Sequence, residues 1–277
     1  MVASVFRAGL FDSQVALVTG GGTGIGLRTA RELAQLGATV VLAGRRGEVV
    51  EGGAQQIVRD GGKAHAFACD VREEGQVTRL IEGILQRCGG LNLVINNAGG
   101  QFPSPAEAIS NKGWNSVIAT NLTGPFLVAQ SAFQQVLKER GGAIVNVVAN
   151  FWRGFPYMAH TGAARAAVSN LTMTLATEWG RYGVRVNAVA PGTIHSSGLD
   201  RYAPEFRGQA LAQGKNNQAA RLGTEAEVAS AIVFLLSPGA RYVTGTTLAV
   251  DAGESLYHPL LPPVAHNRLP PFADPSE

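Results

Sequence analysis

The chain has 277 residues, of which 45 % are hydrophobic and only 16 % are charged. This composition excludes a disordered chain and predicts a large buried core. The net charge is +3, but the 23 Lys and Arg residues are scattered without a basic run, which argues against a nucleic-acid partner. No segment reaches the roughly 18 consecutive apolar residues of a transmembrane helix, so we expect no membrane partner.

Two cysteines, Cys69 and Cys88, are too few for a disulfide framework, and neither lies in a Cys/His cluster of the metal-binding type. We therefore expect no metal site and a reducing compartment. The opening segment Met1–Phe11 is short for a signal peptide, and the final residues are not a peroxisomal Ser-Lys-Leu address. Together these features predict a cytoplasmic location.

Predicted strands and helices alternate along the chain. Short, near-continuous apolar runs predict strands at Val15–Val18, Thr39–Ala43, Ala64–Ala68, Leu91–Ile95, Ala143–Val148, Arg185–Val189 and Thr247–Val250. Helical patterns cover Ile25–Leu36, Glu74–Arg87, an interrupted stretch through Ser104–Leu137, Gly162–Tyr182 and Glu225–Leu236. Strands that are apolar throughout are buried on both faces. The sequence therefore predicts an α/β fold: a single doubly wound (Rossmann) domain, with a parallel seven-stranded sheet and helices on both faces.

This domain is expected to span residues 1–258, because no linker and no internal repeat divides them. The remaining residues, 259–277, hold six prolines and show no periodicity. They predict a Pro-rich C-terminal tail that is extended or disordered.

Glycines follow the first strand directly, in the run Thr19–Gly26, and a helix begins inside that run. Glycine allows a tight turn there, and it lets the backbone approach a pyrophosphate that lies on the helix N-terminus. The sequence thus predicts a dinucleotide site. Its first contacts are Gly20, Gly22, Thr23, Gly24, Ile25 and Gly26.

Two arginines, Arg45 and Arg46, follow the second strand. An enzyme that selects NAD normally has Asp or Glu there for the ribose 2′-hydroxyl, whereas Arg suits the 2′-phosphate of NADP. No acidic residue comes before Glu48, so the sequence predicts NADPH as the cofactor. Asp70 and Val71 follow the third strand, where we expect the adenine. For Asp70, a turn or a helix cap is the alternative.

Four motifs, taken in order, resemble those of the short-chain dehydrogenase/reductase family, and they cover about residues 12–257. Thr19–Gly26 has the T-G-x-x-x-G-x-G spacing, and Asn96–Gly99 matches the N-N-A-G motif. Asn121 matches the family's helix asparagine, which typically holds a bent helix and a water. Pro191–Ser196 is similar to the P-G-x-I-x-T segment that closes over the nicotinamide.

The resemblance implies further cofactor contacts from two of these motifs, and Arg165 can bind the nicotinamide ribose. The resemblance also implies a homotetramer, and a mobile lid over the substrate at Ile194–Arg221. The additional cofactor-binding residues are Asn97, Ala98, Gly99, Arg165, Pro191, Gly192, Ile194 and Ser196.

The catalytic residues depart from the family's pattern of a Ser followed by Tyr-x-x-x-Lys. An alignment on the following A-A-V-S-N-L-T stretch puts Thr161 at the tyrosine position and Arg165 at the lysine position. The serine position falls at Val148 or Ala149, with Asn150 next. Two interpretations remain: a protein that only binds NADPH, or an enzyme whose reaction needs less from its acid.

Chemistry favours reduction of a C=C bond over reduction of a ketone. A ketone needs a positioned proton donor, and a threonine hydroxyl is a poor one. Reduction of an enoyl thioester leaves a delocalised enolate, which needs hydrogen-bond donors as an oxyanion hole does. Thr161 and Arg165 lie four residues apart on one helical face, and Asn150 or Tyr157 are further candidate donors. For Tyr157, simple packing is the alternative. We expect Asn121 to be structural or catalytic.

Three stretches, Asn97–Glu107, Asn111–Trp114 and His160–Ala166, resemble the peroxisomal trans-2-enoyl-CoA reductases. That branch and the related 2,4-dienoyl-CoA reductases reduce acyl-CoA double bonds with NADPH. We therefore predict an NADPH-dependent reductase of the trans-2 double bond of an acyl-CoA thioester. A 2,4-dienoyl-CoA or 3-oxoacyl-type reductase and a non-catalytic NADPH-binding protein are the alternatives.

Overall fold

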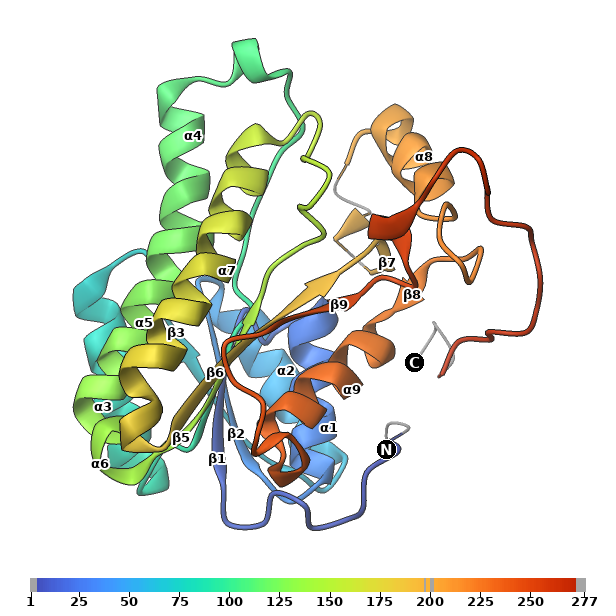
Figure 1. Cartoon of the computed structure of the whole chain (residues 1–277). Helices are drawn as coiled ribbons and strands as arrows, with labels where there is room; N and C mark the ends of the chain where they lie inside the picture. The colour runs from blue at the N-terminus through green and yellow to red at the C-terminus, as the bar shows by residue number, and fades with distance from the viewer. Residues whose placement is uncertain (1–3, 197, 200–201, 273–277) are drawn as a thin grey trace.

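The computed structural model describes residues 4–196, 198–199 and 202–272. At its centre is a seven-stranded sheet in the order β3-β2-β1-β4-β5-β6-β9 (Figure 1). Every pairing in it is parallel, and each strand lies within two residues of a predicted one. The strands are β1 (Val15–Thr19), β2 (Thr39–Gly44), β3 (Lys63–Ala68), β4 (Leu93–Asn96), β5 (Gly142–Val147), β6 (Val184–Pro191) and β9 (Thr247–Val250).

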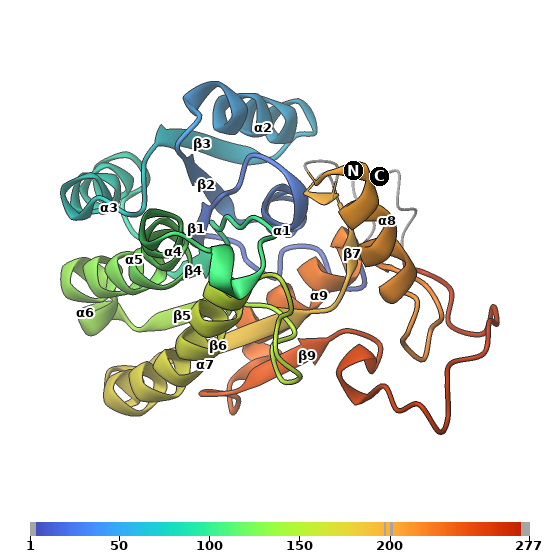
Figure 2. The same ribbon diagram turned by 90° about the horizontal axis from the view of Figure 1, so that it is seen from above.

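Helices cover both faces of the sheet, as Figure 2 shows from above. One face carries α1 (Gly24–Gln35), α2 (Gly47–Arg59) and α9 (Glu225–Leu236). The other face carries α3 (Glu74–Cys88), α5 (Gly124–Ala132) and α7 (Ala159–Trp179). The predicted doubly wound α/β fold is therefore confirmed.

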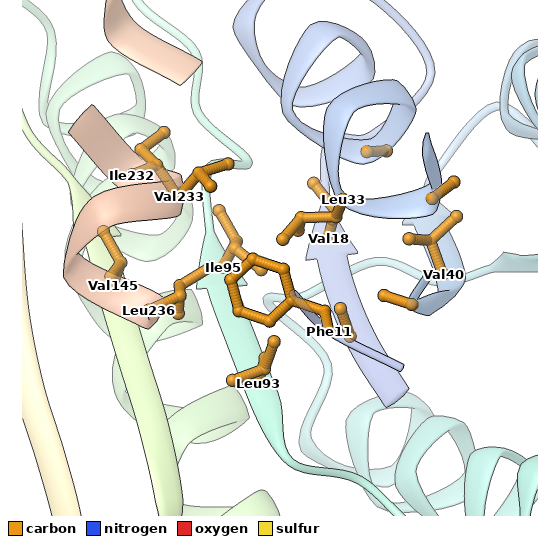
Figure 3. Packing of buried hydrophobic residues seen from close by; sticks show 14 of the residues in the cluster. Phe11, Val18, Leu33, Val40, Leu93, Ile95, Val145, Ile232, Val233 and Leu236 are labelled. Carbon is orange, nitrogen blue, oxygen red and sulfur yellow. The ribbon is translucent and has the colours of Figure 1, made fainter. Parts of the chain in front are cut away.

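The core alternates along each strand, because both faces of the sheet are buried. In β1, Ala16 and Val18 face the layer of α1 and α9, whereas Val15 and Leu17 face the layer of α3 and α5. Phe11 precedes β1 and is fully buried in the first of these layers. Figure 3 shows its ring among the side chains that this layer contributes.

Helix α2 was not among the predicted elements. Gly52 and Gly53 lie in its middle, and a glycine costs a helix about 1 kcal/mol relative to alanine. Gly53 packs against the sheet, where a Cβ would lie 3.0 Å from a methyl carbon of Leu42. Close packing on β2 thus accounts for a helix that local propensity disfavours.

The interrupted helical stretch is resolved into α-helical and π-helical pieces. It comprises a 3₁₀ turn (Ala106–Ala108), α4 (Asn111–Ile118), a π segment (Ala119–Thr123), α5, a second π segment (Phe133–Leu137) and α6 (Lys138–Arg140). A π segment inside a helix is frequent at functional sites. The first one contains Asn121.

The poorly periodic segment Ile194–Arg221 contains more regular structure than its sequence suggests. It holds strand β7 (Ile194–His195), which pairs with β8 (Gly223–Thr224), and helix α8 (Pro204–Gln213). Within the described residues, no helix is both long and apolar enough to cross a membrane.

The predicted tail forms neither helix nor strand over residues 259–272, and residues 273–277 lie outside the described part of the chain. In Figure 1 this segment (red) leaves the body of the molecule and turns back toward it. Arg221 holds it there, because its guanidinium donates to the carbonyls of Leu269 at 2.9 Å and Pro270 at 3.1 Å.

Candidate active site

The glycine run lies at the carboxyl end of β1, between β2 and β4, where the strand order reverses. Open α/β sheets bind ligands at such a switch point. Gly20 has a φ of 63°, and a Cβ on it would lie 2.9 Å from the Cα of Ala98. A Cβ on Gly26 would collide with Asn97 Nδ2 and with the Gly20 carbonyl oxygen. Because neither position has room for a side chain, the loop presents bare backbone at this edge.

Asn97 braces the glycine loop from β4. Its Nδ2 donates to the carbonyls of Thr19 and Gly20, at 3.1 Å each. The Thr19 hydroxyl oxygen accepts the N–H groups of Asn97 and Ala98, at 3.0 Å each, and the hydroxyl donates to the Ile95 carbonyl at 3.2 Å. Asn97 and Ala98 therefore lie at the predicted cleft, and they fix its shape through Thr19.

Helix α1 begins at Gly24, after the exposed N-cap residue Thr23. Gly22, Gly24 and Ile25 are half-buried around this helix end. The first N–H groups of a helix have no intrahelical partner, and they attract anions. The Glu225 carboxylate lies nearby, with Oε1 3.6 Å from the place of a Cβ on Gly24. Burial raises the pKa of Glu225, and the nearby charges of His195 and Arg28 oppose that rise.

The residues predicted to bind the adenosine half follow β2 and β3. Arg45 and Arg46 are exposed at the end of β2. The Asp70 carboxylate accepts bonds from Arg72 Nε at 2.9 and 3.0 Å, and from the Arg72 N–H at 3.1 Å. These hydrogen bonds, with the nearby charge of Arg45, lower the pKa of Asp70. Because Arg72 already bonds to this carboxylate, a contact of Asp70 with adenine stays a prediction. Val71 is buried against the start of α5.

Asn121 is fully buried, and both polar atoms of its side chain bond to Gly100. Its Oδ1 accepts the Gly100 N–H, and its Nδ2 donates to the Gly100 carbonyl, at 2.9 Å each. A Cβ on Gly99 would lie 3.3 Å from Asn121 Oδ1 and would collide with Arg165 Nη2. Asn121 thus holds the loop after β4 against the Arg165 guanidinium.

Arg165 is the strongest electrostatic feature of the site. Its side chain is 8 % exposed, and Nη1 donates to the Val147 carbonyl at 2.8 Å. Among the described residues, no carboxylate forms an ion pair with it. Burial lowers its pKa to about 10, so the guanidinium stays protonated at neutral pH. A buried cation without a counter-ion is costly, and such groups are found where a site must meet negative charge.

Thr161 lies one helical turn before Arg165 on α7 and is fully buried. The Nδ1 atom of His160 accepts the Thr161 N–H at 2.8 Å and lies 3.2 Å from the Thr161 hydroxyl oxygen. Burial lowers the pKa of His160, and the ring of Phe102 packs edge-on against it at 4.5 Å. In this arrangement the Thr161 hydroxyl faces the neutral imidazole, and its contact with a substrate stays a prediction.

Tyr157 lies in the loop before α7 and is 56 % exposed. It adopts a φ of 62°, and its carbonyl accepts the Ser104 N–H at 2.7 Å. Its ring lies 6.5 Å from that of Phe206 on α8, which in turn contacts Tyr202 at 5.2 Å. Tyr202 accepts a bond from Gln101. Aromatic side chains therefore join the loops after β4 and β5 to α8.

Asn150, which follows β5, and the segment after β6 form another side of the candidate site. The Asn150 N–H donates to the Pro191 carbonyl at 3.1 Å, and its Nδ2 lies 3.5 Å from Asp251 Oδ2. Of the residues predicted to contact the nicotinamide, Pro191 and Ile194 are buried, whereas Gly192 and Ser196 are half-buried. The loops before α4 and α7 and helix α8 lie at the same end of the molecule (Figure 1).

A sequence model of the family described as enoyl-(acyl carrier protein) reductase matches residues 20–255, a range that begins directly after Thr19 and includes the other residues of this site. The chain belongs to the short-chain dehydrogenase/reductase family. It is an oxidoreductase of that family, so the predicted family and enzyme class are confirmed.

Three relatives illustrate the range of the similarity. The peroxisomal 2,4-dienoyl-CoA reductase of Mus musculus is 36 % identical over 92 % of this chain and 88 % of its own length. A probable 2,4-dienoyl-CoA reductase of Bacillus subtilis is 36 % identical over 88 % of this chain and 98 % of its own. The solved structure of the citronellol catabolism dehydrogenase AtuB of Pseudomonas aeruginosa PAO1 is 50 % identical. It has a TM-score of 0.82 and covers 91 % of this chain and 99 % of AtuB.

Sequence reasoning missed two features of this short-chain dehydrogenase/reductase site. Thr19 was read only as the first residue of the glycine motif, although its hydroxyl organises the loop after β4. The Gln101–Tyr202 bond joins residues 101 positions apart, so no local pattern announces it. For Thr19 a signal did exist, because a polar residue at the buried end of an apolar strand needs a partner.

Proposed function

We propose that this protein is an NADPH-dependent reductase of a C=C bond conjugated to the thioester of an acyl-CoA. The expected substrate is a trans-2-enoyl-CoA, and a 2,4-dienoyl-CoA is the close alternative. The names of the mouse and Bacillus relatives support the acyl-CoA class. The single observation that carries the proposal is the buried Arg165, which forms no ion pair with a carboxylate of the described residues and lies beside a threonine in place of a stronger acid.

The site fits an anionic dinucleotide. The loop of Gly20 and Gly26 is a cradle that side chains would fill. The N-terminus of α1 offers free N–H groups, and Arg45 and Arg46 provide exposed cations for a 2′-phosphate. Bound there, NADPH supplies a hydride.

The residues of this chain are suited to stabilise an enolate rather than to donate a proton. Hydride addition at Cβ of the enoyl thioester moves negative charge onto the thioester oxygen. A fixed cation and hydrogen-bond donors stabilise such charge strongly in a site that excludes water. Arg165 provides the cation, and Thr161 and Asn150 are candidate donors. To serve as one, the Thr161 hydroxyl has to turn from His160 Nδ1 toward the thioester oxygen. The proton at Cα can come later from water, so no acidic side chain is required.

A second candidate is the dehydrogenation of an alcohol, which the 50 % identical AtuB favours by its description. That reaction must remove a hydroxyl proton, and so it requires a general base. Arg165 stays protonated, and the Thr161 hydroxyl is weakly acidic and turned to His160. Tyr157 would have to serve instead. The site therefore supports the second candidate less well than the first.

The deciding experiment follows NADPH absorbance with a panel of trans-2-enoyl-, 2,4-dienoyl- and 3-oxoacyl-CoA at several chain lengths. NADH serves as the cofactor control, and citronellol with NADP⁺ tests the second candidate. We expect oxidation of NADPH with enoyl- or dienoyl-CoA and none with 3-oxoacyl-CoA. Turnover of 3-oxoacyl-CoA or of the alcohol alone would contradict the proposal. Tight NADPH binding without any turnover would instead indicate a non-catalytic protein.

A further inference from the structure

We propose that Glu254 is a positioning residue that clamps the segment after β6 and so sets how firmly NADPH is held. This inference rests on the proposed function, because it assigns that segment to the nicotinamide half of the cofactor. Glu254 opens a 3₁₀ turn (Glu254–Leu256) that follows β9, far along the chain from the segment it holds.

Both oxygens of the Glu254 carboxylate bond to one residue. Oε2 accepts the Thr193 N–H at 2.9 Å, and Oε1 accepts the Thr193 hydroxyl at 3.2 Å. Thr193 stands between Gly192 and Ile194, both of which are predicted cofactor contacts. A two-point attachment fixes the position and the orientation of Thr193, and through the backbone it fixes both neighbours.

The packing at Gly192 shows how closely the segment is pressed onto this carboxylate. A Cβ on Gly192 would lie 2.6 Å from Glu254 Oε2 and 2.9 Å from the Asp251 Cβ. Only glycine fits, so the segment has no freedom on the side of Glu254. Asp251 in turn accepts the N–H groups of Gly253 and Ser255, at 2.9 Å each, which holds the 3₁₀ turn that presents Glu254.

A cavity of about 210 Å³ lies behind the clamp, and Thr193, Ile194, Arg221, Glu227 and Glu254 are among its lining residues. Burial and the neighbouring Asp251 raise the pKa of Glu254, and the two bonds from Thr193 oppose that rise. The protein thus places a carboxylate where its charge is costly, at a point where it restrains Thr193. The Gly192 N–H, which donates to the Val250 carbonyl at 3.1 Å, and the pairing of β7 with β8 hold the same segment at its other positions.

The test compares Glu254→Ala, Glu254→Gln and Thr193→Val with the wild type. Alanine removes both bonds. Glutamine keeps both, because its carbonyl can accept the Thr193 N–H while its amide donates to the Thr193 oxygen. Valine removes the hydroxyl bond alone. Glu139→Ala, on the exposed end of α6, is the matched control.

Two measurements are made without any acyl substrate: hydrogen exchange of the Thr193 amide and the dissociation constant of NADPH by fluorescence. We expect Glu254→Ala to exchange faster and to bind NADPH about tenfold more weakly. Thr193→Val should weaken NADPH binding about threefold, whereas Glu254→Gln and Glu139→Ala should match the wild type. In turnover, Glu254→Ala should raise KM for NADPH more than it lowers kcat.

Unchanged exchange and NADPH binding in Glu254→Ala would overturn the proposal. So would a Glu254→Gln variant as impaired as Glu254→Ala, because charge rather than the two bonds would then be responsible. If circular dichroism shows that Glu254→Ala is unfolded, Thr193→Val decides. A wild type that binds NADPH but reduces no acyl-CoA would contradict the proposed function and leave this test intact.

Discussion

At the scale of single residues, Arg165 concentrates the chemistry of the site. Replacing it by methionine should lower kcat for an enoyl-CoA about a hundredfold or more, because the enolate loses its fixed cation. Stability should change little, within about 1–2 kcal/mol, since the buried charge has no counter-ion to lose. Steady-state kinetics and urea unfolding measure both effects. The exposed Arg59→Met is the control. Retention of full activity would contradict the role of Arg165.

A variant of Tyr157 distinguishes the two candidate functions, also at the scale of a single residue. Tyr157→Phe keeps the ring that contacts Phe206 and removes only the hydroxyl. An enoyl-CoA reductase should lose less than about threefold in kcat/KM, because its enolate does not depend on that proton. A loss of two orders of magnitude would identify the hydroxyl as the acid and would favour alcohol or ketone chemistry.

At the scale of elements, Glu227 ties α9 to the tail. It completes a capping box with Thr224 and accepts bonds from Arg221 at 2.6 and 3.0 Å. Burial acts to raise the pKa of Glu227, but the bonds from Arg221 and the Thr224 N–H outweigh it and lower the pKa. A lowered carboxyl pKa stabilises the fold above the unfolded value near 4.3, and this contribution is lost as the pH falls through the folded value.

The variant Glu227→Gln should therefore be about 1 kcal/mol less stable than the wild type at neutral pH. The difference should shrink as the pH falls from the unfolded value near 4.3 through the lowered pKa of the folded state, where the wild-type carboxylate becomes protonated as well. Urea unfolding across this pH range measures it, with the exposed Glu139→Gln as the reference. If the difference in the free energy of unfolding does not vary with pH, Arg221 stabilises the capping box of Thr224 and Glu227 by packing alone.

The strands were predictable because each is a short, near-continuous apolar run, as expected where helices cover both faces of a sheet. Helix α2 was not, since Gly53 owes its place to Leu42 on a neighbouring strand. In the site, the glycine loop and Asn97 follow from motifs, whereas the burial of Thr161 depends on His160 and its surroundings. Contacts such as that of Glu254 with Thr193 span 61 positions, and no local pattern encodes them.

At the scale of the whole molecule, a preference for NADPH over NADH should appear as a larger increase in the free energy of unfolding. NADPH at about 100 times its dissociation constant should raise the free energy of unfolding by about 2.7 kcal/mol. The same concentration of NADH should raise it less, because Arg45 and Arg46 meet no 2′-phosphate. Thermal unfolding of the wild type and of the double variant Arg45→Ala, Arg46→Ala measures this. Equal stabilisation of the wild type by both cofactors would contradict selection for NADPH.

The oligomeric state and the division of the chain into residues 1–258 and a tail also stay predictions at this scale. A homotetramer has four times the chain mass of 28.9 kDa, which light scattering of the purified protein detects directly. A monomer in solution would contradict the expectation. The cytoplasmic location is tested separately, by fractionation of the source cells.

The bond between Glu254 and Thr193 also bears on how the protein is made. Residues 193 and 254 lie 61 positions apart, and β9, which pairs with β6, is the last strand of the sheet to be synthesised. At about 5–20 residues per second, a ribosome needs roughly 3–12 s to pass from one residue to the other. During that interval the nascent chain already contains the glycine loop, but the segment after β6 lacks its bonds to Glu254. If Glu254 holds the cofactor segment as proposed, firm retention of the cofactor begins only after β9 and Glu254 have been synthesised.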